Sequence, residues 1–522
     1  MRIAIIGSGI SGIAAARTLQ RIGIDAVVFE RSSTIGGVWA LAYPEVRLQN
    51  ISTHYHLSDF PWPFTPDLHP TGEQIRRYLE AAVKHFGLDI RLNHEVTALS
   101  NDGLVEHLGA PDRLRRPLPQ TPGWTVQTQS PEGSRTEFFD FVIVAVGHYS
   151  QEKPAIDLPG KDEFKGQILT ERDVHNLDVL KDKRVAVVGF GKSAVDMASF
   201  AAQRGSQVHH VFRAPRWLLP RVLFGVHMAD VIFTRMSTMM LPAWTHPHDV
   251  EKALHERFPR VVSGFWNMVT LATRAQLGVH TLWRDPAVRE RMRVLEPDNS
   301  VTYEMRAAAA IAPDDYFPFV VQGRILPYRS NVQGFSKDAL VLADGREIPC
   351  DLVVLAIGHN SPGFPFLPEP YRSMMEAEPD GTQLYRHLVH PRIPRLAFAG
   401  FNHGFLHVPG VEIGTLWTSA VLRGDLELPS PEEMERSAKQ VQEWKRSNSL
   451  LEPSRGYGVS TRFHQYFDVL LADLGLNPFR KSNQLLEWVS AYKADDYRNV
   501  FREYEEARKT RVNPRQPVAF AT

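Results

Sequence analysis

The sequence of 522 residues has a single cysteine, Cys350, and no excess of charge of either sign. One cysteine excludes an intramolecular disulfide bond and any Cys-x-x-Cys metal or redox motif, so a reducing compartment is the simplest interpretation. Lysine plus arginine and aspartate plus glutamate each number 59, which gives a formal charge of zero. This balance argues against a general nucleic-acid-binding protein, which needs clustered basic residues.

Long apolar runs are also missing. The two windows that come closest to a membrane span, 225–244 and 261–278, are interrupted by charged side chains. We therefore expect no transmembrane helix. The first seven residues are too short an apolar run for a signal peptide and have the character of a strand. These features predict a soluble, cytoplasmic protein of several domains, at about 150 residues per domain.

A glycine motif follows the first expected strand. Residues 2–6 are apolar after Arg2, the motif Gly7-x-Gly9-x-x-Gly12 follows, and an expected helix leads to a second strand that ends in Glu30. This is the setting that a dinucleotide fingerprint requires. Gly7 makes the tight turn, Gly9 admits a pyrophosphate, Gly12 packs helix on strand, and the acid accepts hydrogen bonds from a ribose.

A second segment repeats this design. Residues 184–188 form an apolar strand, and Gly189-x-Gly191-x-x-Ala194 opens the next helix. The following strand ends in Arg213 rather than an acid, with Arg216 three residues later. Arginine at this place suits the 2′-phosphate of NADP. The two segments together predict FAD in the first site and NADPH in the second, with the redox chemistry belonging to the flavin.

The spacing of the two motifs predicts an α/β protein with two Rossmann-like domains, the NADPH domain being inserted in a discontinuous FAD domain. Two similar strands, 141–147 and 352–358, each end in Gly-His and bracket the second glycine motif. We interpret them as the points where the chain leaves the FAD domain and returns to it. The expected boundaries are listed here: FAD domain 1–155 and 325–430, NADPH domain 156–324 with a helical insertion at 218–312, and surface helices with a frayed end at 431–522.

The sequence also resembles the flavin-containing monooxygenases, within the wider group that holds the Baeyer–Villiger and N-hydroxylating monooxygenases. The resemblance rests on motifs in family order over most of 1–430, which are Gly7–Gly12, Gly36-Gly-Val-Trp39, Ser58-Asp-Phe-Pro-Trp-Pro63, Phe164-Lys-Gly166, Gly189–Asp196 and Ala356-Ile-Gly358. These motifs are specific for the group and do not name a substrate.

The resemblance implies roles for individual residues. Those expected to contact FAD are Gly7, Ser8, Gly9, Ile10, Ser11, Gly12, Glu30, Gly37, Val38 and Trp39. Those expected to contact NADPH are Gly189, Gly191, Lys192, Ser193, Ala194, Asp196, Arg213 and Arg216. Asn50 matches a family asparagine near the flavin and nicotinamide, one residue closer than usual to Ser58, and is the expected catalytic residue that stabilises the flavin hydroperoxide.

Three departures leave the subclass open. Thr170 stands where the family motif has histidine, and Ile357 replaces a threonine near a domain crossover. Tyr43-Pro44 resembles the Baeyer–Villiger pattern, although Glu45 stands where a glycine would follow.

His54, His56 and His69 lack cysteine or acidic partners nearby, so no metal site is expected.

The resemblance implies an NADPH-dependent FAD monooxygenase. Such an enzyme inserts one oxygen atom of O2 into a nucleophilic nitrogen or sulfur of a small, apolar substrate through a C4a-(hydro)peroxyflavin. The alternatives are a Baeyer–Villiger monooxygenase that acts on ketones, an uncoupled NADPH oxidase, and a non-catalytic FAD-binding protein. A disulfide reductase shares the two folds, but the single cysteine excludes it. A homodimer is an expectation at the level of the family alone.

Overall fold

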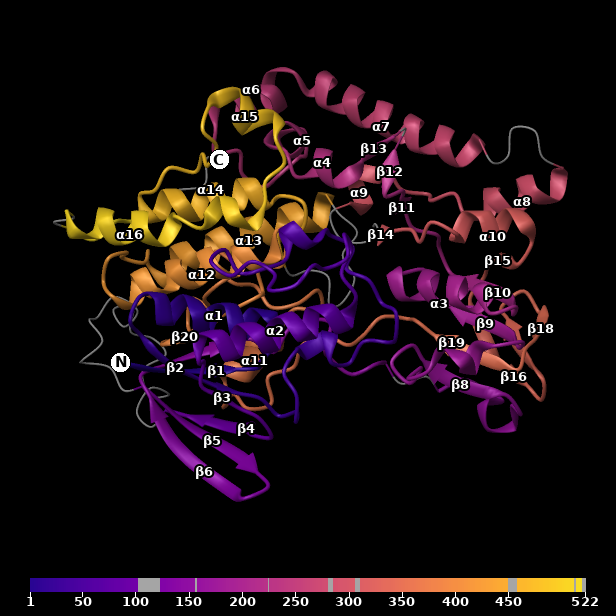
Figure 1. Cartoon of the computed structure of the whole chain (residues 1–522), viewed down its shortest axis with the longest axis horizontal. Helices are drawn as coiled ribbons and strands as arrows, with labels where there is room; N and C mark the ends of the chain where they lie inside the picture. Colours follow the sequence, from indigo (N-terminus) through magenta and orange to yellow (C-terminus); the bar gives the residue numbers. More distant parts are fainter. Residues whose placement is uncertain are drawn as a thin grey trace.

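The computed structural model describes residues 1–101, 123–154, 157–223, 225–279, 285–305, 310–448, 458–510 and 513–518. Two five-stranded parallel sheets organise these residues, and they lie beside each other in Figure 1. In each sheet one strand, Arg2–Ile6 or Arg184–Val188, leads into one of the two glycine turns, as the sequence predicts. The mixed α/β class with two Rossmann-like sheets is therefore confirmed.

The first sheet has the strand order β20-β7-β1-β2-β3. Its strands are β1 (Arg2–Ile6), β2 (Asp25–Phe29), β3 (Ile90–Arg91), β7 (Phe141–Val144) and β20 (Leu396–Phe398). In the central strand Ile3 pairs with Ala26 on one side and with Phe141 on the other. β1, β2, β7 and β20 are short and largely apolar because both faces of the sheet are covered.

Helices cover one face of this sheet, and a small antiparallel sheet packs toward the other. The helices are α1 (Ile10–Arg21), α2 (Gly72–Phe86) and α12 (His407–Leu422), and α11 (Tyr371–Glu376) lies with the antiparallel strands β4 (Glu95–Ser100), β5 (Trp124–Ser130) and β6 (Gly133–Phe139). α12 is buried at nearly every position and lies against α1. It therefore forms the centre of the largest core, between the sheet and the C-terminal helices (Figure 1).

The second sheet has the order β15-β10-β9-β19-β8. Its strands are β8 (Gln167–Thr170), β9 (Arg184–Val188), β10 (Gln207–Phe212), β15 (Ile325–Arg329) and β19 (Leu352–Leu355). The helix α3 (Lys192–Gln203) covers one face. Along the chain, a small antiparallel sheet of β16 (Val332–Ser336), β17 (Ala339–Leu342) and β18 (Glu347–Pro349) follows β15 and precedes β19. All five strands are parallel.

This pairing corrects the expected domain boundary at residue 325. β15 and β19 pair with β10 and β9, so these two strands belong to the second sheet and not to the FAD domain. The chain rejoins the first sheet only at β20, which pairs with β7. The expected boundary at residues 155 and 156 lies outside the described residues.

The region 218–312 is mainly helical, with short strands at its two ends. Its elements, with α10 which follows, are β11 (Leu218–Leu219), β12 (Val222–Leu223), β13 (Val226–His227), α4 (Met228–Ile232), α5 (Arg235–Met239), α6 (Asp249–Arg257), α7 (Pro259–Val279), α8 (Pro286–Val294), α9 (Val301–Glu304), β14 (Ala310–Ile311) and α10 (Tyr316–Gln322). β11 pairs with β14, which closes the insertion at its base.

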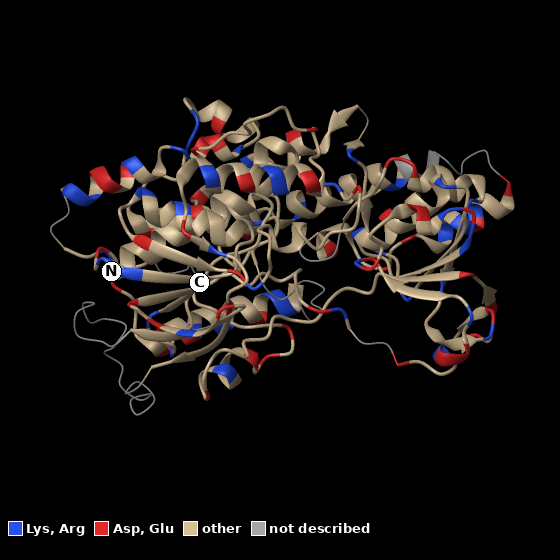
Figure 2. Cartoon of the chain, turned by 60° about the horizontal axis from the view of Figure 1, so that its bottom comes forward, with Lys and Arg blue, Asp and Glu red and all other residues tan. Residues whose placement is uncertain are grey.

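In the described part of the C-terminal region lie the α-helices α13 (Pro431–Asn448), α14 (Phe463–Leu474), α15 (Gln484–Val489) and α16 (Val500–Lys509). The expectation that all are surface helices is wrong for α14, whose side chains are almost all buried against α12. Basic and acidic residues are interspersed on the outer helices (Figure 2). Within the described ranges, no helix is long and apolar enough to cross a membrane.

A buried carboxyl group joins α12 to the loop that precedes α2. Glu412 is 1% exposed and accepts hydrogen bonds from the backbone N–H of Ser58 at 3.2 Å and from its Oγ at 3.1 Å. Arg21 is 3.9 Å away. Burial outweighs this cation and raises the pKa of Glu412 to about 8.

We predict that Glu412→Gln stabilises the protein increasingly as pH rises. The folded-state pKa lies above the unfolded value, so the favourable contribution of Glu412 is complete below the unfolded pKa and is lost as pH rises through about 8. Glutamine keeps the acceptor for Ser58 and carries no charge. The melting temperature of the variant minus that of the wild type should grow between about pH 5 and about pH 9. A pH-independent difference would contradict the proposed protonation of Glu412.

Candidate functional site

One cavity of about 1620 Å³ extends between the carboxyl ends of the two sheets. It is lined by both glycine turns, by the loop before α2, by the start of α12 and by the helical insertion. Fifteen of the predicted site residues line it, which are Gly7, Gly9, Ile10, Ser11, Glu30, Gly37, Val38, Trp39, Asn50, Gly189, Gly191, Lys192, Ser193, Arg213 and Arg216. The remaining four, Ser8, Gly12, Ala194 and Asp196, do not line it.

The first glycine turn is fixed by close backbone contacts. Gly7 has a φ of +107°, and a Cβ there would lie 2.6 Å from the carbonyl oxygen of Ala145 on the neighbouring strand. A Cβ on Gly12 would lie 1.9 Å from the carbonyl oxygen of Gly7. Both positions therefore require glycine, which explains why Gly12 matters although it does not line the cavity.

A second loop closes over this turn. Gly37 has a φ of +56°, and a Cβ there would come within 3.0 Å of the Cα of Gly9. Gly9 is the N-cap of α1 and makes no side-chain capping hydrogen bond with the described residues. Backbone N–H groups at this helix start are thus presented to the cavity without a side chain in front of them. This cradle fits the pyrophosphate of FAD.

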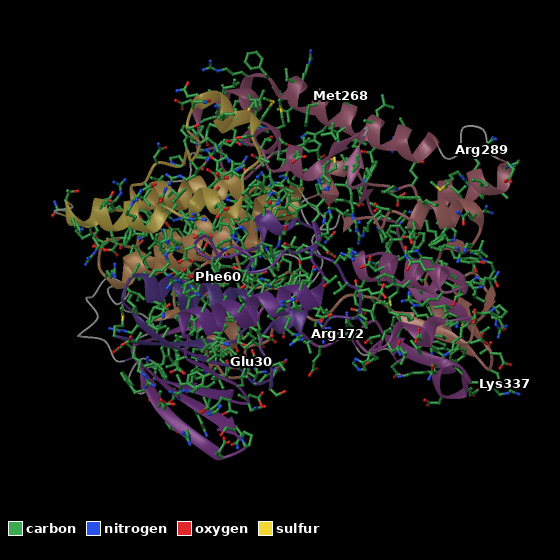
Figure 3. All side chains as sticks on the ribbon, in the orientation of Figure 1. Glu30, Phe60, Arg172, Met268, Arg289 and Lys337 are labelled. Atoms are coloured by element: carbon green, nitrogen blue, oxygen red, sulfur yellow. The ribbon has the colours of Figure 1, made fainter. Side chains whose placement is uncertain are left out.

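Glu30 holds the turn as well as facing the cavity. Its Oε2 accepts hydrogen bonds from the backbone N–H and the Oγ of Ser8 at 2.8 and 2.9 Å, and its Oε1 accepts one from the N–H of Ser32 at 2.9 Å. Oε1 keeps a further acceptor site, and the side chain, labelled in Figure 3, lines the cavity. The arrangement fits the predicted contact with a ribose diol.

The second glycine turn repeats the geometry of the first. Gly189 has a φ of +121°, and a Cβ there would lie 2.2 Å from the carbonyl oxygen of Ala356 on β19. Gly191 is the N-cap of α3 and, like Gly9, has no side-chain cap among the described residues. The second helix start therefore fits a second pyrophosphate, that of NADPH.

Asp196 has a different place from the one expected. Its carboxylate accepts a hydrogen bond from the hydroxyl of Tyr43 at 2.8 Å and forms an ion pair with Lys192. The residue is buried and does not line the cavity, so the expected contact with NADPH does not match this geometry. Tyr43 follows the Gly36–Trp39 loop, and the contact ties the two dinucleotide regions together.

Arg213 and Arg216 lie just beyond the end of β10. Arg213 is exposed and Arg216 is half-buried, and both line the cavity at the side of the second glycine turn. Two guanidinium groups at this strand end can form charge-assisted hydrogen bonds with a phosphate. Their position fits the 2′-phosphate of NADPH.

Two chain crossings join the sheets. The backbone N–H of Asn360 donates to the carbonyl of Glu152 at 2.9 Å, which links one crossing to the other. Lys153 donates to the carbonyl of Gly358 at 2.8 Å and forms an ion pair with Glu171. Arg172, labelled in Figure 3, donates to the carbonyl of Gln151 at 2.5 Å. These contacts define how the two glycine turns face each other.

Asn50 lies where three parts of the chain meet. Its side-chain Nδ2 donates to the backbone carbonyl of Phe405, just before α12, at 2.5 Å. Its backbone carbonyl accepts from the Nδ1 of His69 at 3.0 Å. The neighbouring Gln49 accepts from the N–H of Ile311 in the insertion at 2.8 Å. The predicted catalytic residue is thus at the meeting point of the FAD region, α12 and the insertion.

A histidine cluster beside the first glycine turn was not predicted as part of the site. The Nε2 of His407 lies 3.0 Å from the Oγ of Ser11, and His403 and His407 are joined through their Nδ1 atoms at 3.2 Å. His148 lies nearby, and all three line the cavity. Burial lowers the pKa of His148 to about 3 and that of His403 to about 4, so both are neutral. The only signal in the sequence is the Gly147-His148 pair after β7.

The wall near Asn50 is mainly apolar. It is formed by Met228, Ala229, Ile232 and Phe233 of the insertion and by Phe405. The rings of Phe233 and Phe405 have centroids 5.9 Å apart. This wall, which comes from a different part of the chain than the glycine turns, can exclude water from a substrate held beside Asn50.

Comparisons with known proteins agree with this arrangement. The model of flavin-binding monooxygenase-like proteins matches residues 1–264 and 291–486. The probable flavin-containing monooxygenase 1 of Arabidopsis thaliana is 30% identical, covering 95% of this chain and 96% of its own. The N-oxide-forming dimethylaniline monooxygenase 2 of Oryctolagus cuniculus is 26% identical, covering 91% of this chain and 83% of its own.

A solved structure, an oxidized steroid monooxygenase bound to NADP, superposes with a TM-score of 0.62 at 20% identity, covering 92% of this chain and 99% of its own. At this identity the likeness concerns the fold. The family match, in contrast, covers most of the chain and includes both glycine turns. Together with the shared cavity, it leads to one conclusion: the chain belongs to the flavin-binding monooxygenase-like family.

Proposed function

We propose that this enzyme transfers one oxygen atom from O2 to a nucleophilic nitrogen or sulfur of a small organic substrate. The observation that carries the proposal is the single cavity that receives both glycine turns and continues to the apolar wall beside Asn50. A hydride donor, a flavin and a substrate can meet there without leaving the protein.

The chain is a flavoprotein monooxygenase that uses FAD and NADPH, as its family does. When bound, FAD supplies the redox chemistry by accepting a hydride from NADPH and by reacting with O2. We propose that the turns at Gly7–Gly12 and Gly36–Trp39, with Glu30, hold FAD. We propose that the turn at Gly189, with Arg213 and Arg216, holds NADPH.

The side chains of this site act by position and by excluding water. Asn50 is held by Phe405 and His69, so its amide keeps one orientation at the edge of the cavity. The wall of Ile232, Phe233 and Phe405 keeps the reacting atoms dry. The amine or thioether substrate is itself the nucleophile that attacks the electrophilic oxygen. The proposed reaction therefore needs no nucleophilic side chain of the protein.

A competition experiment tests this function. The enzyme with NADPH and isotopically labelled O2 is offered a thioether, a tertiary amine and a cyclic ketone together, and products are identified by mass spectrometry. Label in a sulfoxide or an N-oxide supports the proposal. A labelled lactone would instead show insertion into ketones. Hydrogen peroxide equal to the NADPH consumed, with no labelled product, would show an NADPH oxidase.

We predict that Arg213→Ala raises the Michaelis constant for NADPH about 10- to 100-fold, because a charged hydrogen bond to phosphate is worth about 1.5–3 kcal/mol. The constant for NADH should change less than about twofold, since NADH has no 2′-phosphate. Steady-state kinetics with both nucleotides measure this. Arg293→Ala, which removes an exposed arginine of α8, is the matched control. Equal changes for the two nucleotides would remove the phosphate assignment.

We predict that Asn50→Ala increases the hydrogen peroxide released per NADPH oxidised. The substitution removes the hydrogen bond to Phe405 and opens space for water at the apolar wall. Peroxide and product are measured in the same reaction at saturating substrate. Asn477→Ala, at an exposed position outside the cavity, should leave the ratio unchanged. If Asn50→Ala keeps the wild-type ratio, Asn50 has only a structural role.

A further inference from the structure

His69 has one ring nitrogen committed to the backbone. Its Nδ1 lies 3.1 Å from the carbonyl oxygen of Leu48 and 3.0 Å from that of Asn50. Both partners are acceptors, so Nδ1 carries the proton and donates to them. In the neutral ring Nε2 is then an acceptor with a lone pair.

The Nε2 atom has no hydrogen-bond donor within the part of the chain that the structure describes. The side chain is only 7% exposed, and it lines the cavity beside Asn50. A buried acceptor without a donor is unfavourable, and in a binding site it indicates a group that a ligand satisfies.

The groups around His69 favour its neutral form. The ring of His227 stacks on that of His69, with centroids 5.6 Å apart. The Nδ1 of His227 accepts a hydrogen bond from the N–H of Ala229 at 3.2 Å. Burial, followed by the charge of Arg221, lowers the pKa of His69. Arg221 also lines the cavity, and its cation disfavours a second cation near this place. An amine would therefore bind here as the neutral base, which is its nucleophilic form.

We propose that the Nε2 of His69 accepts a hydrogen bond from the N–H of an amine substrate, so that the enzyme favours primary and secondary amines. The inference rests on the proposed function and names the substrate class for the same site. The backbone carbonyl of Asn50 fixes the His69 ring, and Asn50 is the residue expected to lie near the flavin and nicotinamide. The hydrogen bond would place the amine nitrogen beside it.

The chemistry of such substrates sets them apart from tertiary amines and thioethers. For a secondary amine the overall reaction is R2NH + O2 + NADPH + H⁺ → R2NOH + NADP⁺ + H2O. The nitrogen lone pair forms the N–O bond as the O–O bond breaks, the other oxygen atom leaves as water, and NADPH supplies the two electrons. The nitrogen is then cationic and loses its N–H proton to solvent, while His69 stays neutral. A tertiary amine or a thioether has no such proton to lose.

The substrates for the test form a matched set, which is N-methylbenzylamine, N,N-dimethylbenzylamine and benzyl methyl sulfide. Two variants separate the two nitrogens of the ring. His69→Asn keeps a donor at the place of Nδ1 and removes the acceptor, whereas His69→Gln keeps an acceptor at the place of Nε2. His85→Gln, on the exposed side of α2 and outside the cavity, is the control.

We expect wild-type kcat/KM to be highest for the secondary amine. In His69→Asn this value should fall about tenfold relative to those of the tertiary amine and the sulfide, as for the loss of one hydrogen bond. His69→Gln should restore most of the ratio. An equal loss for all three substrates, or a larger change in His69→Gln than in His69→Asn, would overturn the inference and leave His69 as a support for Asn50.

Calorimetry on the oxidised, FAD-loaded enzyme with NADP⁺ gives a readout that does not depend on turnover. The secondary amine should bind about tenfold more weakly to His69→Asn than to wild type, and the tertiary amine equally to both. If the tertiary amine and sulfide are oxidised but no ratio depends on His69, the inference fails and the proposed function stands. If no substrate yields product, the proposed function fails, and the binding ratio alone decides the role of His69.

Discussion

The close approach of each glycine turn to the carbonyl of a neighbouring strand is the constraint on which the site depends. A Cβ on Gly7 would lie 2.6 Å from the oxygen of Ala145, and a Cβ on Gly189 would lie 2.2 Å from that of Ala356. Because both turns pack against the end of a neighbouring strand, the helices that follow start at the carboxyl ends of their sheets. Their N–H groups are therefore directed to one cavity. The same device, used twice, provides two sites for dinucleotides.

This repetition also explains which part of the fold the sequence predicts and which part it does not. Both glycine segments and the strands around them follow from short apolar runs and turn residues. The similar strands at 141–147 and 352–358 are predicted as the points where the chain leaves the FAD domain and returns to it, and both lead into the crossings, yet β7 lies beside β1 in the first sheet and β19 beside β9 in the second. The two strands are alike because each meets a glycine turn of its own sheet. The sequence similarity reflects the equivalent positions of the two strands in their sheets, and only the strand pairing shows to which sheet each strand belongs.

The site is predictable to the extent that its residues belong to local motifs. Gly7, Glu30, Gly189 and Arg213 hold positions fixed by a strand and the helix or turn beside it, so spacing alone places them. His69 and the His403–His407 pair depend on contacts between segments far apart in the chain, such as Ser11 with His407 at 3.0 Å. No periodicity encodes such contacts. The roles of α14 and Asp196 were missed for the same reason, since both are set by long-range packing.

The contact of Tyr43 with Asp196 shows how the two sites are coupled. Tyr43 follows the loop that closes over Gly9, and Asp196 lies on the helix that starts at Gly191. The hydroxyl is fully buried, and burial raises the pKa of Tyr43, so it stays protonated and donates its hydrogen bond. A shift of either glycine loop would break this bond and remove one partner of the buried Asp196 carboxylate, which also pairs with Lys192. The geometry that brings nicotinamide and flavin together is therefore held by a polar contact behind the cavity, which leaves the cavity wall free to vary with the substrate.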